Sequence, residues 1–213
     1  MPFNQQGFAT WRNALDLALN GMNIAILVTD GFEQVELTEP KKALEAEGAF
    51  TRIVSDRYDT VRGMHHEQPG EEFQVDLRLE EADAKAFDAL LLPGGKVNAA
   101  ALRNIEEAQR FARAFDDDGK PIAVICHGAW LLVSAGLVEG RTLTSHPTLE
   151  QEIRDAGGHW VDQEVVVDGM LVSSRKPADI PAFNDKTIEV IAARMQANLQ
   201  GKADGHAVGI ATS

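Results

Sequence analysis

Short apolar runs alternate along this chain with longer segments in which apolar residues recur at helical spacing. The apolar runs are rich in Ile, Val and Leu and cover Met22–Thr29, Phe50–Ser55, Phe87–Leu92 and Pro121–Ile125. Such runs are typical of strands buried on both faces of a parallel sheet. Helices are predicted over about Glu33–Glu47, Asn104–Asp118, Ala129–Gly136, Pro147–Ala156 and Ala178–Leu199. The alternation of strands with helices predicts an α/β fold with a mainly parallel central sheet.

Two stretches depart from this alternation. Between Asp56 and Asp83 the apolar pattern loosens around Gly and Pro residues, which predicts a small hairpin or an exposed excursion. Nearer the C-terminus, Asp168-Gly169 separates the alternating runs Trp160–Val167 and Leu171–Ser174. Because Asp-Gly between such runs is a strong hairpin signal, a second hairpin is expected there.

The length and composition of the chain fit one α/β domain. With 213 residues and 44% hydrophobic residues, it can bury most of its apolar surface in one core, which we place at residues 22–199. Residues 1–21 form an N-terminal extension, predicted to be an amphipathic helix, and residues 200–213 are predicted to form a loose tail. The extension's apolar residues at helical spacing are Phe8, Trp11, Leu15 and Leu19.

The charge balance excludes several classes of partner. Lys and Arg total 20 against 33 Asp and Glu, a formal net charge of -13, so neither nucleic acid nor an anionic membrane surface is an expected partner. The first twenty residues show no secretory signal and no membrane span. One cysteine cannot form an intramolecular disulfide, which fits a cytoplasmic protein.

The single cysteine, Cys126, stands between a predicted strand and a predicted helix. In α/β enzymes a sharp turn of this kind holds a nucleophile above the sheet, near the positive end of a helix macrodipole. On this interpretation the thiol ionises more readily than usual. The alternative is that Cys126 only packs at the end of a core strand, as buried cysteines often do.

Two further loops are expected at the same edge of the sheet, because the carboxyl ends of parallel strands meet there. The first carries Glu33 and Glu36, either of which could hydrogen-bond the Cys126 sulfur; alternatively, both only favour a helix N-terminus. The second carries Gly94 and Gly95, which let backbone amides approach a ligand and stabilise an oxyanion. Lys96 alone is weak support for a phosphate-binding loop.

Histidines provide the remaining candidate chemistry. His127 follows Cys126 directly and precedes Gly128, so its ring points away from the thiol unless the turn bends it back; it could act as acid or base on a substrate. His146 follows the next predicted strand and could line the same pocket, although either histidine could equally be a capping or packing residue. The segment His65-His66-Glu67 fits a solvated loop better than a metal site, and no metal is predicted.

Four motifs in order make the chain resemble the ThiJ/PfpI superfamily, specifically its protease I branch with a class I glutamine amidotransferase-like domain. They are Asp30–Leu37, Phe87–Gly95, Ile125–Gly128 and Val172–Asp179, within a likeness that covers roughly Asn23 to Ala197. The resemblance implies a flavodoxin-like three-layer sandwich and a homo-oligomer, a dimer or higher. It also implies a nucleophilic Cys126 whose sulfur contacts a glutamate, with Glu36 and Glu33 as the matching positions, and no cofactor.

The chain departs from this resemblance after the Pro-Gly-Gly turn. Relatives often carry an acidic residue there that orients the histidine beside the cysteine, whereas this chain reads Val97–Arg103 without a carboxylate. Because an unoriented imidazole is a weak base, a proteolytic Cys-His-acid triad is disfavoured. The expected function is a stress-response enzyme acting on a small aldehyde or a glycated protein. The alternatives are a cysteine-based oxidation sensor without turnover and an intracellular cysteine peptidase.

Overall fold

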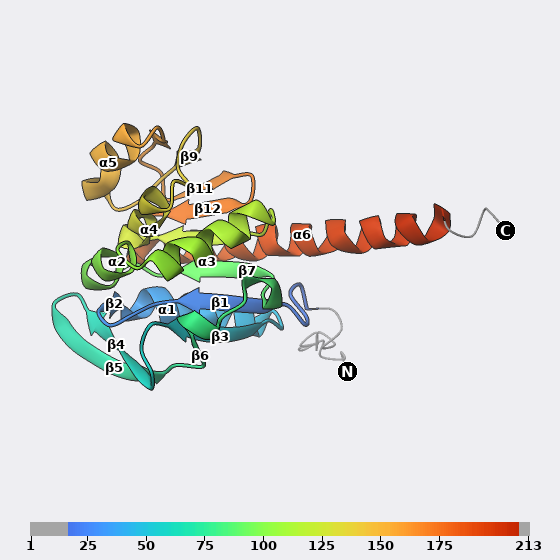
Figure 1. Ribbon diagram of the computed structural model, residues 1–213. Coiled ribbons are helices and arrows are strands. Elements are labelled where there is room, and N and C mark those ends of the chain that lie inside the picture. Colours follow the sequence, from blue (N-terminus) through green and yellow to red (C-terminus); the bar gives the residue numbers. More distant parts are fainter. Residues whose placement is uncertain (1–16, 209–213) are drawn as a thin grey trace, which may run out of the picture.

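A seven-stranded sheet in the order β11-β12-β8-β7-β1-β3-β6 forms the centre of the molecule. The computed structural model describes residues 17–208. Every neighbouring pair in the sheet is parallel except β11–β12, which is an antiparallel hairpin at one edge. From the central strand β1 the chain moves to β3 on one side and then to β7 on the other (Figure 1). The strand order therefore reverses beside β1.

The strands of this sheet are short. They are β1 (Asn23–Leu27), β3 (Phe50–Ser55), β6 (Leu77–Arg78), β7 (Ala89–Leu92), β8 (Ile122–Ile125), β11 (Val165–Asp168) and β12 (Leu171–Ser174). The helices are α1 (Gln34–Ala46), α2 (Lys96–Leu102), α3 (Glu106–Asp117), α4 (Ala129–Ser134), α5 (Glu150–Asp155) and α6 (Ile180–Val208). Short 3₁₀ turns join them: η2 (Leu79–Glu81), η3 (Ala84–Ala86), η4 (Cys126–Gly128), η5 (Pro147–Leu149) and η6 (Pro177–Asp179).

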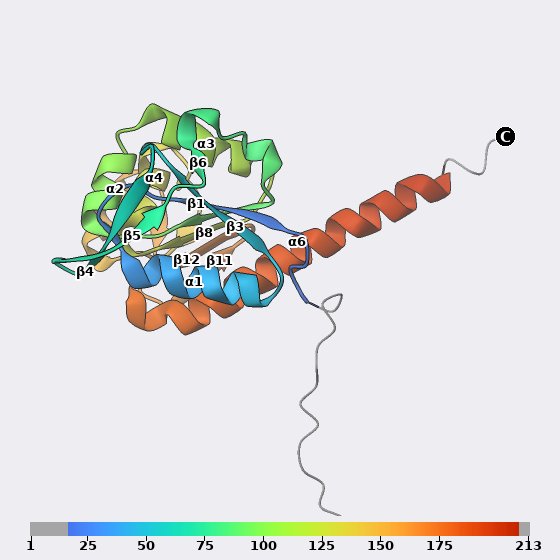
Figure 2. The same cartoon turned by 90° about the horizontal axis from the view of Figure 1, so that it is seen from below.

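Both faces of the sheet are covered, which explains the unbroken apolar runs. Successive residues of β1 point to opposite faces, so Ile24 and Ile26 pack in one cluster while Ala25 and Leu27 pack in the other. Helices α1 and α6 cover the first face, and α3 and α4 cover the second (Figure 2). Each strand is therefore buried twice, as parallel sheets require.

Two smaller sheets flank this core. Strand β2 (Phe32–Glu33) pairs with β4 (Thr60–His65), which forms a hairpin with β5 (Gln68–Gln74). Strands β9 (Thr142–Leu143) and β10 (His159–Trp160) make a short parallel pair beside α5 (Figure 1). The β4–β5 hairpin reaches back to the start of α1, which places it beside the candidate site.

The predicted fold class is confirmed: the molecule is an α/β three-layer sandwich with a mainly parallel sheet. Both hairpins form where the Gly, Pro and Asp-Gly signals placed them. Helix α2 was missed, because only seven residues separate the Gly-Gly turn from the next bend. The tail prediction for 200–213 is wrong in part, since α6 continues to Val208. Residues 17–21 form a turn, and the rest of the predicted N-terminal helix lies outside the described residues.

Truncating a side chain in the layer between α6 and the sheet should destabilise the whole domain. Phe183 of α6 is fully buried, so Phe183→Ala should lower the free energy of unfolding by about 3–5 kcal/mol. Phe50→Ala is the matched control: this ring is 64% exposed, and its loss should change stability by about 1 kcal/mol or less. Urea denaturation of both variants measures this, and equal losses would contradict the assignment of α6 to the core.

Candidate active site

The loops after β1, β7 and β8 meet where the strand order reverses, at the carboxyl edge of the sheet. In open α/β sheets this is where ligands bind. The three loops bring Glu36, Gly94, Gly95 and Cys126 together, as the contacts below show. The sequence motifs predicted to converge therefore do lie side by side.

Cys126 occupies a strained turn between β8 and α4. Its φ angle is +62°, in the left-handed region that residues other than Gly, Asn and Asp rarely adopt. The next residues continue as the single 3₁₀ turn η4, and Gly128 is needed there because a Cβ would stand 2.7 Å from the Leu92 carbonyl oxygen. Backbone strain of this kind clusters at functional sites. The turn resembles the strained strand-to-helix turn that holds a nucleophile in α/β enzymes.

Gly94 lets the glutamate and the cysteine approach each other. A Cβ at Gly94 would lie 2.5 Å from Glu36 Oε2 and 2.7 Å from the Cys126 Cβ, so no larger residue fits between them. Gly95 has φ +85° and is packed against the backbone of Gly31 and Phe32. Both glycines therefore allow a close approach of the main chain beside Cys126. Their predicted role in stabilising an oxyanion stays a prediction.

Glu36 is a fully buried carboxyl group at the first turn of α1. Its Oε2 accepts a 2.8 Å hydrogen bond from the Gly94 N–H, and its Oε1 has no hydrogen-bond partner of good geometry. Burial raises the pKa of Glu36 to about 8; the Gly94 N–H and the Cys126 thiol act in the opposite direction. Near neutral pH this carboxyl group therefore holds its proton and can donate it.

The predicted ready ionisation of Cys126 is wrong for this structure. The residue is only 7% exposed, and burial, followed by the negative charge of Glu36, raises the pKa of its thiol above the usual range. Helix α4 has only six residues, so its macrodipole is too short to outweigh burial. The backbone N–H groups of His127 and Gly95 hydrogen-bond the sulfur and act in the opposite direction. When Glu36 is protonated, its charge no longer opposes the thiolate.

Glu33 serves a different purpose from Glu36. Its Oε2 accepts a 3.1 Å hydrogen bond from the His66 N–H, at the turn of the β4–β5 hairpin. Gln34, the next residue, exchanges hydrogen bonds with Glu71 of the same hairpin. These contacts attach the hairpin to the start of α1. Of the two candidates, Glu36 is the one beside the sulfur.

The turn bends the His127 ring back toward the thiol, with Nδ1 3.2 Å from the Cys126 Sγ. The ring stacks on His146, with centroids 4.2 Å apart, and lies 5.3 Å from the Trp130 ring. Burial, together with the neighbouring His146 and Lys96, lowers the pKa of His127 to about 4. His127 is therefore a neutral imidazole near neutral pH, as a base must be.

Asn98 is a site residue that the sequence did not reveal. It is fully buried on α2, and its amide nitrogen donates to the carbonyl oxygens of Pro93 (3.1 Å) and Gly94 (2.9 Å). Its Oδ1 accepts a 2.8 Å hydrogen bond from Thr29 N–H, after β1. Asn98 thus joins two of the three loops. A polar residue in an otherwise apolar Val97–Leu102 segment was the available signal.

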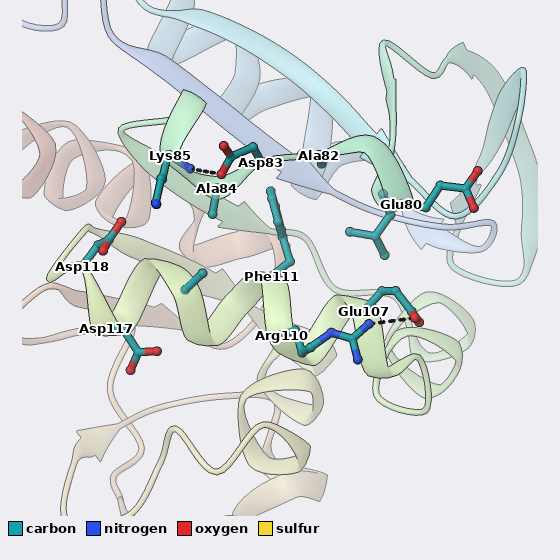
Figure 3. Close-up of a pocket in the computed structure, with 12 residues that line it drawn as sticks. Glu80, Ala82, Asp83, Ala84, Lys85, Glu107, Arg110, Phe111, Asp117 and Asp118 are labelled. Atoms are coloured by element: carbon teal, nitrogen blue, oxygen red, sulfur yellow. Dashed lines mark hydrogen bonds and ion pairs between the residues drawn. The ribbon is translucent and has the colours of Figure 1, made fainter.

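Other features of the described part of the chain lie outside this site. A pocket of about 430 Å³ lies between α3 and the η2–η3 segment (Figure 3), and its lining contains no cysteine or histidine. Among residues 17–208 no cluster of three His, Cys, Asp or Glu side chains could hold a metal ion. In the same residues no helix is long and apolar enough to cross a membrane.

Comparison with known proteins agrees with the motifs. The profile of the DJ-1/PfpI family matches residues 22–190. Deglycase TK1284 of Thermococcus kodakarensis is 39% identical over 170 residues, which are 80% of this chain and 99% of that protein. General stress protein 18 of Bacillus subtilis is 39% identical over 173 residues, covering 80% and 98% of the two chains.

A solved structure shows the same architecture. The ThiJ/PfpI domain protein from Brachyspira murdochii superposes with a TM-score of 0.75, at 27% identity over 80% of this chain and 96% of that chain. The resemblance inferred from the four motifs is confirmed by these matches.

Because the pKa of Glu36 is raised in the folded protein, the unfolding free energy should decrease as the pH rises. Between its ordinary value of 4.5 and about 8, the folded carboxyl binds more protons than the unfolded one. His127, lowered from 6.5 to about 4, acts oppositely but only below about 6.5. From about pH 6.5 to about pH 8.5, the unfolding free energy should therefore drop by about 1–2 kcal/mol through Glu36.

Urea denaturation at both pH values measures this drop. In Glu36→Gln the side chain cannot titrate, so the unfolding free energy should not drop between these pH values. In Glu39→Gln, where the changed residue is exposed on α1, the drop should be the same as in the unmodified protein. A drop of the same size in Glu36→Gln would refute the assignment.

Proposed function

Because this chain belongs to the DJ-1/PfpI family, we propose that it is a cysteine-dependent enzyme acting on aldehydes of the methylglyoxal type, free or as adducts on proteins. The observation that carries the proposal is the contact of one thiol with two proton-handling groups, Glu36 and His127, at the loop edge of the sheet. A relative named as a deglycase supports this substrate class.

The two groups beside Cys126 differ in protonation near neutral pH, and this difference assigns their roles: the pKa of Glu36 is raised and that of His127 is lowered. Burial keeps Glu36 protonated near neutral pH, so it acts as the acid. His127 is neutral, and its Nδ1 lies 3.2 Å from the sulfur, so it accepts the thiol proton. The N–H groups of Gly95 and His127 then stabilise the thiolate.

The chemistry needs no external oxidant or reductant. The sulfur bonds to the aldehyde carbon, the carbonyl electron pair moves to its oxygen, and that oxygen takes the Glu36 proton. The carboxylate then removes the proton from the former aldehyde carbon and returns it to the neighbouring ketone carbon. The hydroxyl proton moves from the first oxygen to the former ketone oxygen, which leaves a lactoyl thioester. Water hydrolyses the thioester to lactate and frees the thiol. An internal transfer of hydrogen thus converts aldehyde and ketone into acid and alcohol.

Removing the sulfur should abolish this turnover. Cys126→Ala should form no lactate from methylglyoxal above the uncatalysed rate, because no thioester can form. Lactate production by purified protein is the measurement. Since Cys126 is the only cysteine, iodoacetamide should inactivate the unmodified protein to the same level. Turnover that survives both treatments would refute the proposal.

A second candidate is an oxidation sensor without turnover. Its support is that the Gly95 and His127 amides face the sulfur and would equally bind the oxygen atoms of an oxidised form. No second cysteine exists to trap a sulfenic acid as a disulfide within one chain, so oxidation would proceed to the sulfinic acid. A relative named general stress protein 18 is consistent with such a role.

Mild peroxide separates the two candidates. The sensor predicts that Cys126 gains two oxygen atoms, read by mass spectrometry, in protein that makes no lactate. The enzyme predicts lactate formation that peroxide destroys as Cys126 is oxidised. Protein that neither turns over methylglyoxal nor takes up oxygen would contradict both.

Peptidase activity is the least supported of the three candidates. No carboxylate contacts either ring nitrogen of His127 in the described part of the chain, so the imidazole lacks the partner of a Cys-His-acid triad. Assembly into a dimer or a higher oligomer stays a prediction, as does a cytoplasmic location.

A further inference from the structure

The Thr148 hydroxyl group contacts two imidazole rings near Cys126, those of His127 and His146. Its hydroxyl oxygen is 2.8 Å from His146 Nδ1 and 3.4 Å from His127 Nε2. It belongs to η5, the turn that follows β9 and the short loop carrying His146. The backbone fixes this arrangement, because the His146 N–H donates to the Cys126 carbonyl oxygen at 3.2 Å. Two loops are thereby joined through one hydroxyl group.

One contact with a fixed direction suggests an assignment for the others, because a backbone N–H can only donate. The Thr148 N–H donates to His146 Nδ1 at 3.4 Å, so that nitrogen carries no proton. The Thr148 O–H must then donate to His146 Nδ1, because two acceptors cannot share a contact of 2.8 Å without a proton. Having one proton only, the hydroxyl faces His127 as an acceptor. On this assignment, His127 carries its proton on Nε2.

We propose that Thr148 is a positioning residue that holds His127 in the Nε2–H tautomer, so that the unprotonated Nδ1 faces the Cys126 thiol. The inference rests on the proposed function for the identity of the nucleophile. In a catalytic triad an acidic residue sets the tautomer and the orientation of the histidine ring. Here a neutral hydroxyl supplies them.

The step that Thr148 prepares is a single proton transfer. The S–H bond of Cys126 breaks, its electron pair stays on sulfur, and the proton bonds to His127 Nδ1. The Nε2–H group of the resulting imidazolium still donates its hydrogen bond to the Thr148 hydroxyl oxygen. The charged or titratable groups facing this ring are Cys126 itself, His146 from the β9–η5 loop and Lys96 from α2.

A neutral hydroxyl group should have a smaller effect than a carboxylate. It fixes the tautomer but cannot offset the positive charge of the imidazolium, which the nearby Lys96 further disfavours. Stacking on His146 and the neighbouring Trp130 restrains the ring independently of Thr148. Loss of the hydroxyl should therefore change reactivity by about threefold to tenfold, which corresponds to one hydrogen bond.

The tautomer can be read directly by ¹⁵N NMR of histidine-labelled protein. The Thr148→Val variant keeps the shape of the side chain but removes the hydroxyl group, and Thr148→Ser restores the hydroxyl group. His127, identified by the signal missing from His127→Ala, should be the Nε2–H tautomer in the unmodified protein and in Thr148→Ser. In Thr148→Val it should become a mixture of tautomers.

Cys126 reactivity gives the second measurement, because it is the only thiol to alkylate. Thr148→Val should slow the reaction with iodoacetamide about threefold to tenfold, and Thr148→Ser should stay within about twofold of the unmodified rate. In a His127→Ala background, Thr148→Val should have no further effect. A merely structural role would slow alkylation in both backgrounds.

An unchanged His127 tautomer in folded Thr148→Val, or equal slowing in both backgrounds, would overturn the inference. Thermal unfolding of each variant identifies any that fail to fold. If Thr148→Val does not fold, the test is made on Thr148→Ser, in which His127 must have the same tautomer as in the unmodified protein. Neither measurement requires turnover. If lactate formation is absent but the tautomer and alkylation results are as expected, the proposed function fails while the role of Thr148 stands.

Discussion

A carboxylic acid buried against a thiol is the constraint on which the rest of this structure depends. Glu36 is fully buried, and an isolated charge at such a position would be costly, so the carboxyl group keeps its proton to an unusually high pH. Its one strong partner, the Gly94 N–H, is available only because Gly94 has no side chain. The Gly-rich loop, the first turn of α1 and the cysteine turn are therefore mutually dependent.

Residues that touch no reacting group maintain this arrangement. Asn98 fixes the Pro93–Gly94 backbone through two hydrogen bonds, and it also contacts the segment after β1. Glu33 and Gln34 attach the β4–β5 hairpin to the same helix start. Side chains from neighbouring elements thus hold the loops after β1 and β7 in place beside Cys126.

The sequence alone predicted the architecture and the meeting of three loops, because parallel strands are unbroken apolar runs and their carboxyl ends share one edge. It did not predict that the pKa of the Cys126 thiol is raised. That result depends on how deeply the thiol is buried beside a short helix, which the sequence does not show. Nor did it separate Glu36 from Glu33, which depends on where a distant hairpin turn places His66. The ring position of His127 depended on the φ angle of its neighbour, which sequence does not specify.

The left-handed backbone at Cys126 has a consequence for how this position can change. A residue with a Cβ in that conformation costs about 1–2 kcal/mol relative to glycine, which offsets part of the stability that burial of the Cys126 side chain contributes. Val, Ile or Thr, branched at Cβ, would be the least tolerated there. The side chains that this backbone accepts are therefore limited first by the φ angle and only then by the space around the sulfur.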